Sequence, residues 1–141
     1  MELAMTMMTP VLALIIWTLI VWIWMYATRI PAMQKAKIHP QKAIHAGALS
    51  VLPTNVRVVA ENYNHLHEQP TLFYALAIYS HLVGVADPIN IYLAWGYVAL
   101  RVAHSVAQII LKKVMIRFSL FALLSVLLII MAVRNLLALV G

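Results

Sequence analysis

Long stretches without a charged residue alternate with short polar connections along this chain. No charge occurs from 3 to 28, and further apolar runs occupy 72–85, 89–111 and the region from 118 to 140. A helix needs ~20 mostly apolar residues to cross a ~30 Å hydrocarbon core. The pattern predicts an all-α, integral membrane four-helix bundle. Its spans are expected at about 8–30, 55–85, 89–111 and 115–139, within a single domain over residues 1–141.

The second predicted span is polar in its first half and apolar in its second half. Polar residues in the first half recur at steps of three or four, which places them on one stripe of a helix. This stripe comprises Arg57, Glu61, Asn64, His65 and Glu68. We therefore expect a continuous polar face at one end of this helix.

A second polar row lies in the third span. Arg101, His104 and Gln108 are spaced by three and four residues and share one helix face. An arginine in an apolar span needs an opposite charge or a water-filled cavity, because an unpaired buried ion costs several kcal/mol. Glu68 or Glu61 is the partner that we expect for Arg101.

The amino-acid composition limits the kinds of chemistry that this chain can perform. Hydrophobic residues make up 65% of the 141 residues and charged residues only 10%, where a soluble domain carries about 25% charged residues. Four spans leave no room for a separate soluble catalytic module. The chain has no cysteine, which excludes a disulfide, a thiolate metal site and a protein-borne sulfur nucleophile. Any thiol that takes part in chemistry must come from a ligand.

His65 and His67 flank Leu66, and this alternate spacing resembles that of two histidines that bind one metal ion. Residues two apart on a helix point about 200° away from each other, so one ion cannot easily take both. No metal site is predicted.

The net charge of +6 is concentrated in the connections between apolar runs, without the aromatic pattern of a nucleic-acid surface. Basic loops stay in the cytoplasm. Eight of the ten basic residues flank the first and third connections, whereas Glu2 and Asp87 lie on the other side. Both termini are therefore expected outside. The eight are Arg29, Lys35, Lys37, Lys42, Arg57, Lys112, Lys113 and Arg117.

Two stretches resemble a known family. RVVAENYNHLHEQPTLFYAL at 57–76 looks like the second-helix motif of the MAPEG family, the membrane-associated proteins in eicosanoid and glutathione metabolism. LRVAHSVAQIILKKVMIRF at 100–118 resembles its third-helix Arg-x-x-His signature, followed by a basic residue at the start of helix four. The resemblance covers essentially the whole chain and is to a little-characterised bacterial branch. It implies a homotrimer in the bacterial inner membrane, with a site between subunits.

The resemblance also implies a glutathione site near the cytoplasmic side. Arg117 matches the arginine that stabilises the thiolate and is the expected catalytic residue. Three positions depart from the family pattern: Glu61 stands where an arginine is frequent, His65 where the family has asparagine, and Gln108 where it has tyrosine. The residues expected to hold glutathione are Glu68, His65, Arg101, His104, Gln108 and Lys113.

Three functions remain open from the sequence. The first is a glutathione-dependent transferase or peroxidase, in which a thiolate attacks a lipophilic small molecule that arrives from the membrane lipids. The second is a non-catalytic lipid-binding or partner-presenting protein of the same fold. The third is a small proton-coupled exporter, although exporters of that kind place the acid in an apolar first span.

Overall fold

The computed structural model describes residues 6–41 and 46–141, and the regular structure in these residues is helical, with no strand. Glu2 and Lys42, two of the charges used to predict orientation, lie outside the described residues. The helices, in chain order, are α1 (Met8–Lys35), η3 (Ala46–Leu49, a 3-10 turn), α2 (Thr54–His65), α3 (Gln69–Leu82), α4 (Pro88–Val106), η4 (Ala107–Leu111, a π turn) and α5 (Val114–Val140).

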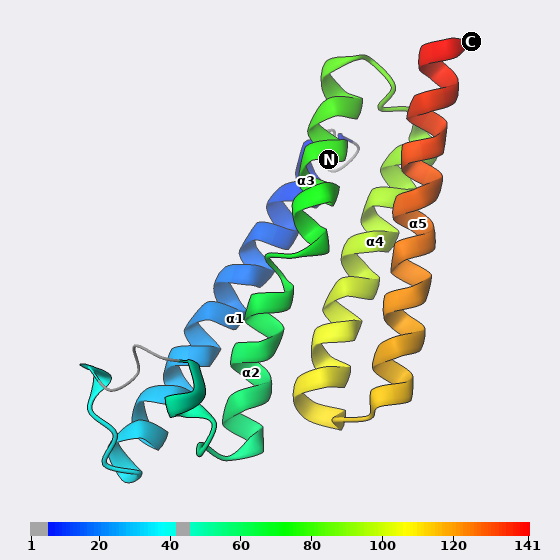
Figure 1. Cartoon of the computed structure of the whole chain (residues 1–141). Helices are drawn as coiled ribbons and strands as arrows, with labels where there is room; N and C mark the ends of the chain where they lie inside the picture. The colour runs from blue at the N-terminus through cyan, green and yellow to red at the C-terminus, as the bar shows by residue number, and fades with distance from the viewer. Residues whose placement is uncertain (1–5, 42–45) are drawn as a thin grey trace.

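The helices form an elongated bundle (Figure 1). Helices α2 and α3 follow one another alongside α1, and α4 pairs with α5. Helix α1 begins and α5 ends toward the same end of the bundle. The α4–α5 contact is close at Gly96, where an added Cβ would lie 3.1 Å from Leu127 Cδ1.

Within residues 6–41 and 46–141, three segments are long and apolar enough to cross a membrane: α1, α4 together with η4, and α5. Their outer faces carry large apolar side chains, such as Ile23 at 61% exposure and Leu139 at 72%. A water-soluble protein rarely exposes such a continuous apolar surface. The chain is an integral membrane protein, as predicted.

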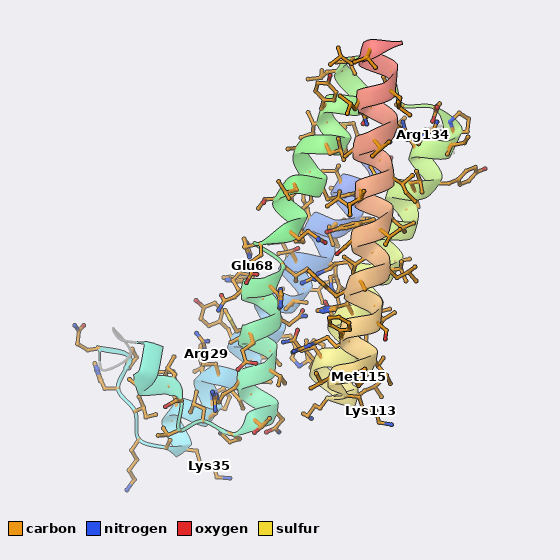
Figure 2. All side chains as sticks on the ribbon, turned by 45° about the vertical axis from the view of Figure 1, so that its right-hand side comes forward. Arg29, Lys35, Glu68, Lys113, Met115 and Arg134 are labelled. Carbon is orange, nitrogen blue, oxygen red and sulfur yellow. The ribbon has the colours of Figure 1, made fainter. Side chains whose placement is uncertain are left out.

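The charged side chains divide between the two ends of the bundle. Figure 2 places Arg29, Lys35 and Lys113 toward one end and Arg134 toward the other. The described parts of the first and third connections therefore lie at a common end, as the predicted topology requires.

The second predicted span differs from expectation, because one helix was predicted and the structure has two. Helix α2 ends at His65, and the amides that follow it bond three residues back, as in Glu68 N–H to His65 O at 3.1 Å. Pro70 stands at the start of α3, where its missing N–H costs nothing. Glu68 therefore lies in the break between helices and does not extend the polar stripe of α2.

The third span is helical to Leu111, but its last turn is widened. In η4 the Lys112 N–H bonds the Ala107 carbonyl at 2.7 Å, five residues back. Lys112 then adopts a left-handed conformation with φ of 55°. π turns occur frequently at functional sites.

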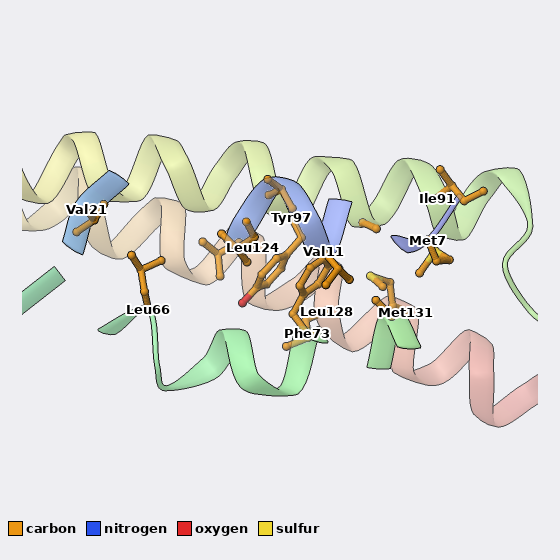
Figure 3. Packing of buried hydrophobic residues seen from close by; sticks show 14 of the residues in the cluster. Met7, Val11, Val21, Leu66, Phe73, Ile91, Tyr97, Leu124, Leu128 and Met131 are labelled. Carbon is orange, nitrogen blue, oxygen red and sulfur yellow. The ribbon is translucent and has the colours of Figure 1, made fainter. Parts of the chain in front are cut away.

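The apolar core lies where α1, α2 and α3 meet α4 and α5 (Figure 3). Phe73 on α3 stacks on Tyr97 on α4, with ring centroids 4.5 Å apart. The Tyr97 hydroxyl donates to Gln69 Oε1 at 3.0 Å, and Gln69 Nε2 donates to Ser125 Oγ at 2.9 Å. This chain of hydrogen bonds joins α3, α4 and α5 in the middle of the bundle.

The turn between α3 and α4 is held by a second polar group. Gly84 adopts φ of 78°, and Asp87 caps α4 by accepting from the Asn90 N–H at 2.8 Å. Arg134 on α5 donates to the Asp87 carboxylate and, at 2.8 Å, to Asn90 Oδ1. This short turn is therefore tied to the last helix.

Candidate functional site

Helix α4 and η4 direct a row of polar side chains into the bundle. The exposed fractions are 0% for Arg101, 1% for His104, 0% for Ser105 and 4% for Gln108. Ser105 accepts a hydrogen bond from Trp17 Nε1 of α1 at 3.1 Å. The inward face that the spacing predicted for the third span is confirmed.

Arg101 is the largest fully buried side chain in the described part of the chain, and none of its three guanidinium nitrogens has a hydrogen-bond partner there. The expected pairing with a glutamate is wrong within one chain. Glu61 lies 4.0 Å from Arg57, and Glu68 Oε2 lies 3.6 Å from His65 Nδ1. Glu68 attracts Arg101 from a distance, but no carboxylate forms a hydrogen bond to the guanidinium, where a buried cation normally has such a partner.

Three rings form a cluster next to Arg101. His65, the last residue of α2, meets His104 edge-on with centroids 5.7 Å apart, and each imidazole lies 6.0 Å from the ring of Phe121. His104 Nδ1 is buried without a hydrogen-bond partner. The charges of Arg101 and Arg117 both act on the two histidines. The helices thus bring together residues that are far apart in sequence.

Arg117 lies in the first turns of α5 and is half-buried. It lines a cavity of about 160 Å³ together with Gln108, Lys112 and Lys113. The first amides of a helix lack partners within it and favour an anion. Three cationic side chains and the start of α5 therefore surround one small cavity, and Gln108 joins it to the buried row on α4.

Sequence reasoning missed Asn62, which is fully buried and donates to Gln108 Oε1 at 2.9 Å. A signal was present in the sequence. Asn62 follows Val59 by three residues and precedes Leu66 by four, which places it in an apolar stripe. A polar residue in such a stripe needs a buried partner, and here Gln108 supplies it.

The two histidines around Leu66 point to different partners. His65 contacts His104 and Glu68, whereas the His67 ring contacts the Tyr63 carbonyl oxygen at 2.9 Å. Among the described residues, no group of three His, Cys, Asp or Glu side chains could hold a metal ion.

Comparison with known proteins decides the family. The model of the MAPEG family matches residues 7–137, nearly the whole chain. The chain belongs to the MAPEG family. No curated protein matches this MAPEG chain, and no solved structure does.

The MAPEG chain brings most of its predicted site residues together. His65 and His104 are in ring contact, and Gln108, Lys113 and Arg117 line one cavity. Glu68 differs from them, because its side chain is 65% exposed in the break between α2 and α3. The candidate site therefore extends from an exposed residue, Glu68, to the buried polar face of α4.

Proposed function

We propose that this MAPEG-family protein is a glutathione-dependent transferase or peroxidase that acts on lipophilic electrophiles. The observation that carries the proposal is a concentration of positive charge. Arg101 is buried without a hydrogen-bond partner among the described residues, and three basic side chains line the cavity at the start of α5. Such a region favours an anionic ligand, since a buried unpaired cation is costly. Glutathione is a tripeptide with two carboxylates and a thiol.

The residues fit the charged ends of glutathione. Arg101 has three buried nitrogens without a hydrogen-bond partner, and Lys113 adds a cation to the lining of the cavity. The cavity of about 160 Å³ is smaller than the ~300 Å³ at which pockets for whole small molecules begin. It would take one end of the tripeptide, and a neighbouring subunit would complete the site. The proposal includes the homotrimer that the family resemblance implies, with the site between subunits.

Arg117 would supply the chemistry. A free thiol has a pKa near ~8.5 and attacks only as thiolate. A guanidinium at a helix start stabilises that anion and stays charged when partly desolvated. The glutathione thiolate would attack the electrophilic carbon, a carbon–sulfur bond would form, and the leaving group would depart with the bonding electrons. The lipophilic partner would enter sideways from the membrane.

The membrane arrangement belongs to the same proposal. Helices α2 and α3 lie end to end along α1 (Figure 1) and together would form the fourth crossing. The first and third connections would then be cytoplasmic and both termini external, in a bacterial inner membrane. This arrangement places the Arg117 cavity on the side where cytoplasmic glutathione is found.

Arg117 is the position to test. Purified wild-type protein is expected to bind glutathione and to show the ultraviolet absorbance of a bound thiolate. Arg117→Ala should lose that absorbance and reduce conjugation by about 10²–10³-fold, with a smaller loss of binding. Arg117→Lys should recover only part, because an ammonium lacks the planar fork of donors. Lys35→Ala removes a cation outside the cavity and serves as the matched control.

Wild-type protein with no thiolate absorbance at saturating glutathione would overturn the enzyme proposal. An Arg117→Lys variant with wild-type behaviour in every assay would overturn the role of Arg117 alone and make it a headgroup anchor. For the assembly, cross-linking in native membranes should give trimers, and a clean monomer or dimer would refute that part alone.

A second function has one observation in its favour. Glu61 is 53% exposed and carries negative charge where the family often has arginine, and this charge would repel an anionic tripeptide. A non-catalytic lipid-binding or partner-presenting protein of the same fold would tolerate it. This function requires that wild-type protein bind no glutathione. The exporter has less support, because Glu68 is exposed in a helix break and not enclosed in an apolar span.

A further inference from the structure

Helix α1 ends in a Schellman motif, a pair of backbone hydrogen bonds that closes the last turn of many helices. The Ile38 N–H donates to the Met33 carbonyl oxygen at 2.9 Å, and the Lys37 N–H donates to the Gln34 carbonyl oxygen at 3.1 Å. Ile38 also packs in the small apolar cluster that contains Met33 and Leu52. Backbone bonds and side-chain packing therefore both hold Lys37 in its conformation.

Helix α3 ends in the same motif at the opposite end of the bundle (Figure 1). The Val85 N–H donates to the Ser80 carbonyl oxygen at 2.9 Å, and the Gly84 N–H donates to the His81 carbonyl oxygen at 3.4 Å. The residue that turns the chain has a positive φ in both motifs, 78° at Gly84 and 57° at Lys37. Glycine adopts this left-handed backbone without strain, whereas a Cβ is crowded there. One motif thus contains the favoured glycine and the other a strained lysine.

A residue that is held in a strained backbone conformation points to a use for its side chain. Lys37 and its neighbour Lys35 are exposed, and neither forms an ion pair with a described carboxylate. No Asp or Glu occurs from 3 to 60, so no acidic neighbour in this segment neutralises them. The charge of Lys37, which glycine would lack, is therefore the property that an external anion can use.

The position of the two lysines along α1 places them at the membrane surface. Arg29 is the first charge after the charge-free stretch, and Lys35 follows it by six residues, about 9 Å along a helix. Figure 2 shows Arg29 and Lys35 toward the same end of the bundle. The headgroup layer on each side of a bilayer is roughly 5–7 Å thick. Because lysine side chains extend toward polar layers, Lys35 and Lys37 reach the phosphates at the outer edge of this layer.

The surface formed by Lys35 and Lys37 is separate from the candidate glutathione site. Lys112 also has a positive φ, of 55°, but it lines the cavity at Arg117 and belongs to that site. A larger cavity of about 640 Å³ between α1 and α2 contains Glu61, at a position where the family often has arginine. Neither cavity is lined by Lys35 or Lys37.

We propose that Lys35 and Lys37 form a docking surface for anionic phospholipids, in which each ammonium pairs with a headgroup phosphate and anchors the end of α1. An anionic leaflet attracts lysines next to a span, and the attraction fades within a Debye length, about 8 Å at physiological salt. A zwitterionic headgroup carries its own cation beside the phosphate and therefore competes with the lysine. The proposal requires a membrane-spanning α1 and is independent of glutathione chemistry.

Lipid retention tests the charge. Full-length protein is reconstituted in nanodiscs of equal parts phosphatidylglycerol and phosphatidylcholine at about 0.1 M salt, and the lipids retained after release into detergent are counted by native mass spectrometry. Wild-type protein should prefer phosphatidylglycerol. Lys37→Gly should lower this preference about fivefold, the value of one lysine near an anionic surface, and Lys35→Ala should lower it by a similar factor. Lys37→Arg keeps the charge and should match wild type.

Thermal unfolding separates the charge from the strain. Lys37→Gly should raise the unfolding midpoint, because glycine relieves the left-handed backbone, even though the same variant retains less phosphatidylglycerol. Gly84→Ala, in the matched motif of α3, should lower the midpoint, because its φ of 78° is unfavourable for a Cβ, and should leave the lipid preference unchanged. A lysine with a purely structural role would move the midpoint without the lipid preference.

Three outcomes would overturn the proposal. Equal retention of the two lipids by wild-type protein would remove the preference for an anionic headgroup. An unchanged preference in the double variant Lys35→Ala/Lys37→Gly would show that these lysines do not contact the lipid. Displacement of phosphatidylglycerol by saturating inorganic phosphate would assign the surface to a soluble anion. Glutathione binding should stay at the wild-type level in these variants, so a failure here leaves the glutathione proposal standing.

Discussion

Asn62 on α2 donates a 2.9 Å hydrogen bond to Gln108 in the π turn that follows α4, and both side chains are buried. The bond joins the polar helix to the widened turn next to the Arg117 cavity. Gln108 also lines that cavity. One side chain therefore connects the packing of α2 to the candidate site.

Gln108→Leu should destabilise the protein, because it leaves the Asn62 amide buried without an acceptor. The expected loss is ~1–3 kcal/mol in the free energy of unfolding, measured by thermal or denaturant unfolding in detergent. The double variant Asn62→Leu/Gln108→Leu should recover part of the loss, since no polar group is then stranded. A strictly additive double variant would show that the two amides do not interact.

Arg101 and Glu68 should be only weakly coupled within one chain, because Glu68 attracts the guanidinium from a distance without bonding to it. The two side chains form no ion pair there, so the loss from Arg101→Met and that from Glu68→Gln should add to within about 0.5 kcal/mol in monomeric, detergent-dispersed protein. The same cycle is then repeated on the cross-linked assembly. A coupling present only in the assembly would identify Glu68 of a neighbouring subunit as the partner of Arg101. Coupling well above about 0.5 kcal/mol in the monomer would contradict the described geometry.

Asp87 combines two roles that substitution can separate. Asp87→Ala should lose the cap of α4 and the contact with Arg134, at a cost of about 1–2 kcal/mol in unfolding free energy. Asp87→Asn keeps an acceptor for the Asn90 N–H and should lose less than half of that. Unfolding midpoints of the two variants check the difference. Equal losses would mean that the ion pair, and not the cap, carries the stability of the turn.

The predicted orientation can be read from cysteine labelling, because the native chain has no cysteine. Lys37→Cys and Lys112→Cys should react with an impermeant reagent only after the cell interior becomes accessible. Val83→Cys, at the opposite end of the bundle, should react in intact cells and is the matched control. Labelling of both basic connections in intact cells would mean that the topology is inverted.

The hydrophobic pattern was sufficient for the class of protein and for most helix positions. Apolar runs of membrane length allow little except a helix, because lipid cannot satisfy free backbone groups. The spacing of Arg101, His104 and Gln108 likewise determined that they share a face, since that follows from helix geometry alone. The family was recognisable for a related reason, because its motifs are short local patterns that can be read directly in the second and third spans.

Only the tertiary structure decided which polar residues meet. The sequence predicted a glutamate partner for Arg101 from charge alone. The break before Pro70 instead places Glu68 at the surface, and the guanidinium has no hydrogen-bond partner among the described residues. The Asn62–Gln108 bond joins residues 46 apart in sequence, and no local pattern specifies such a contact. Helical periodicity determines the face on which a side chain lies. Its partner depends on how the helices rotate and break against one another, and the packing of the whole bundle sets that.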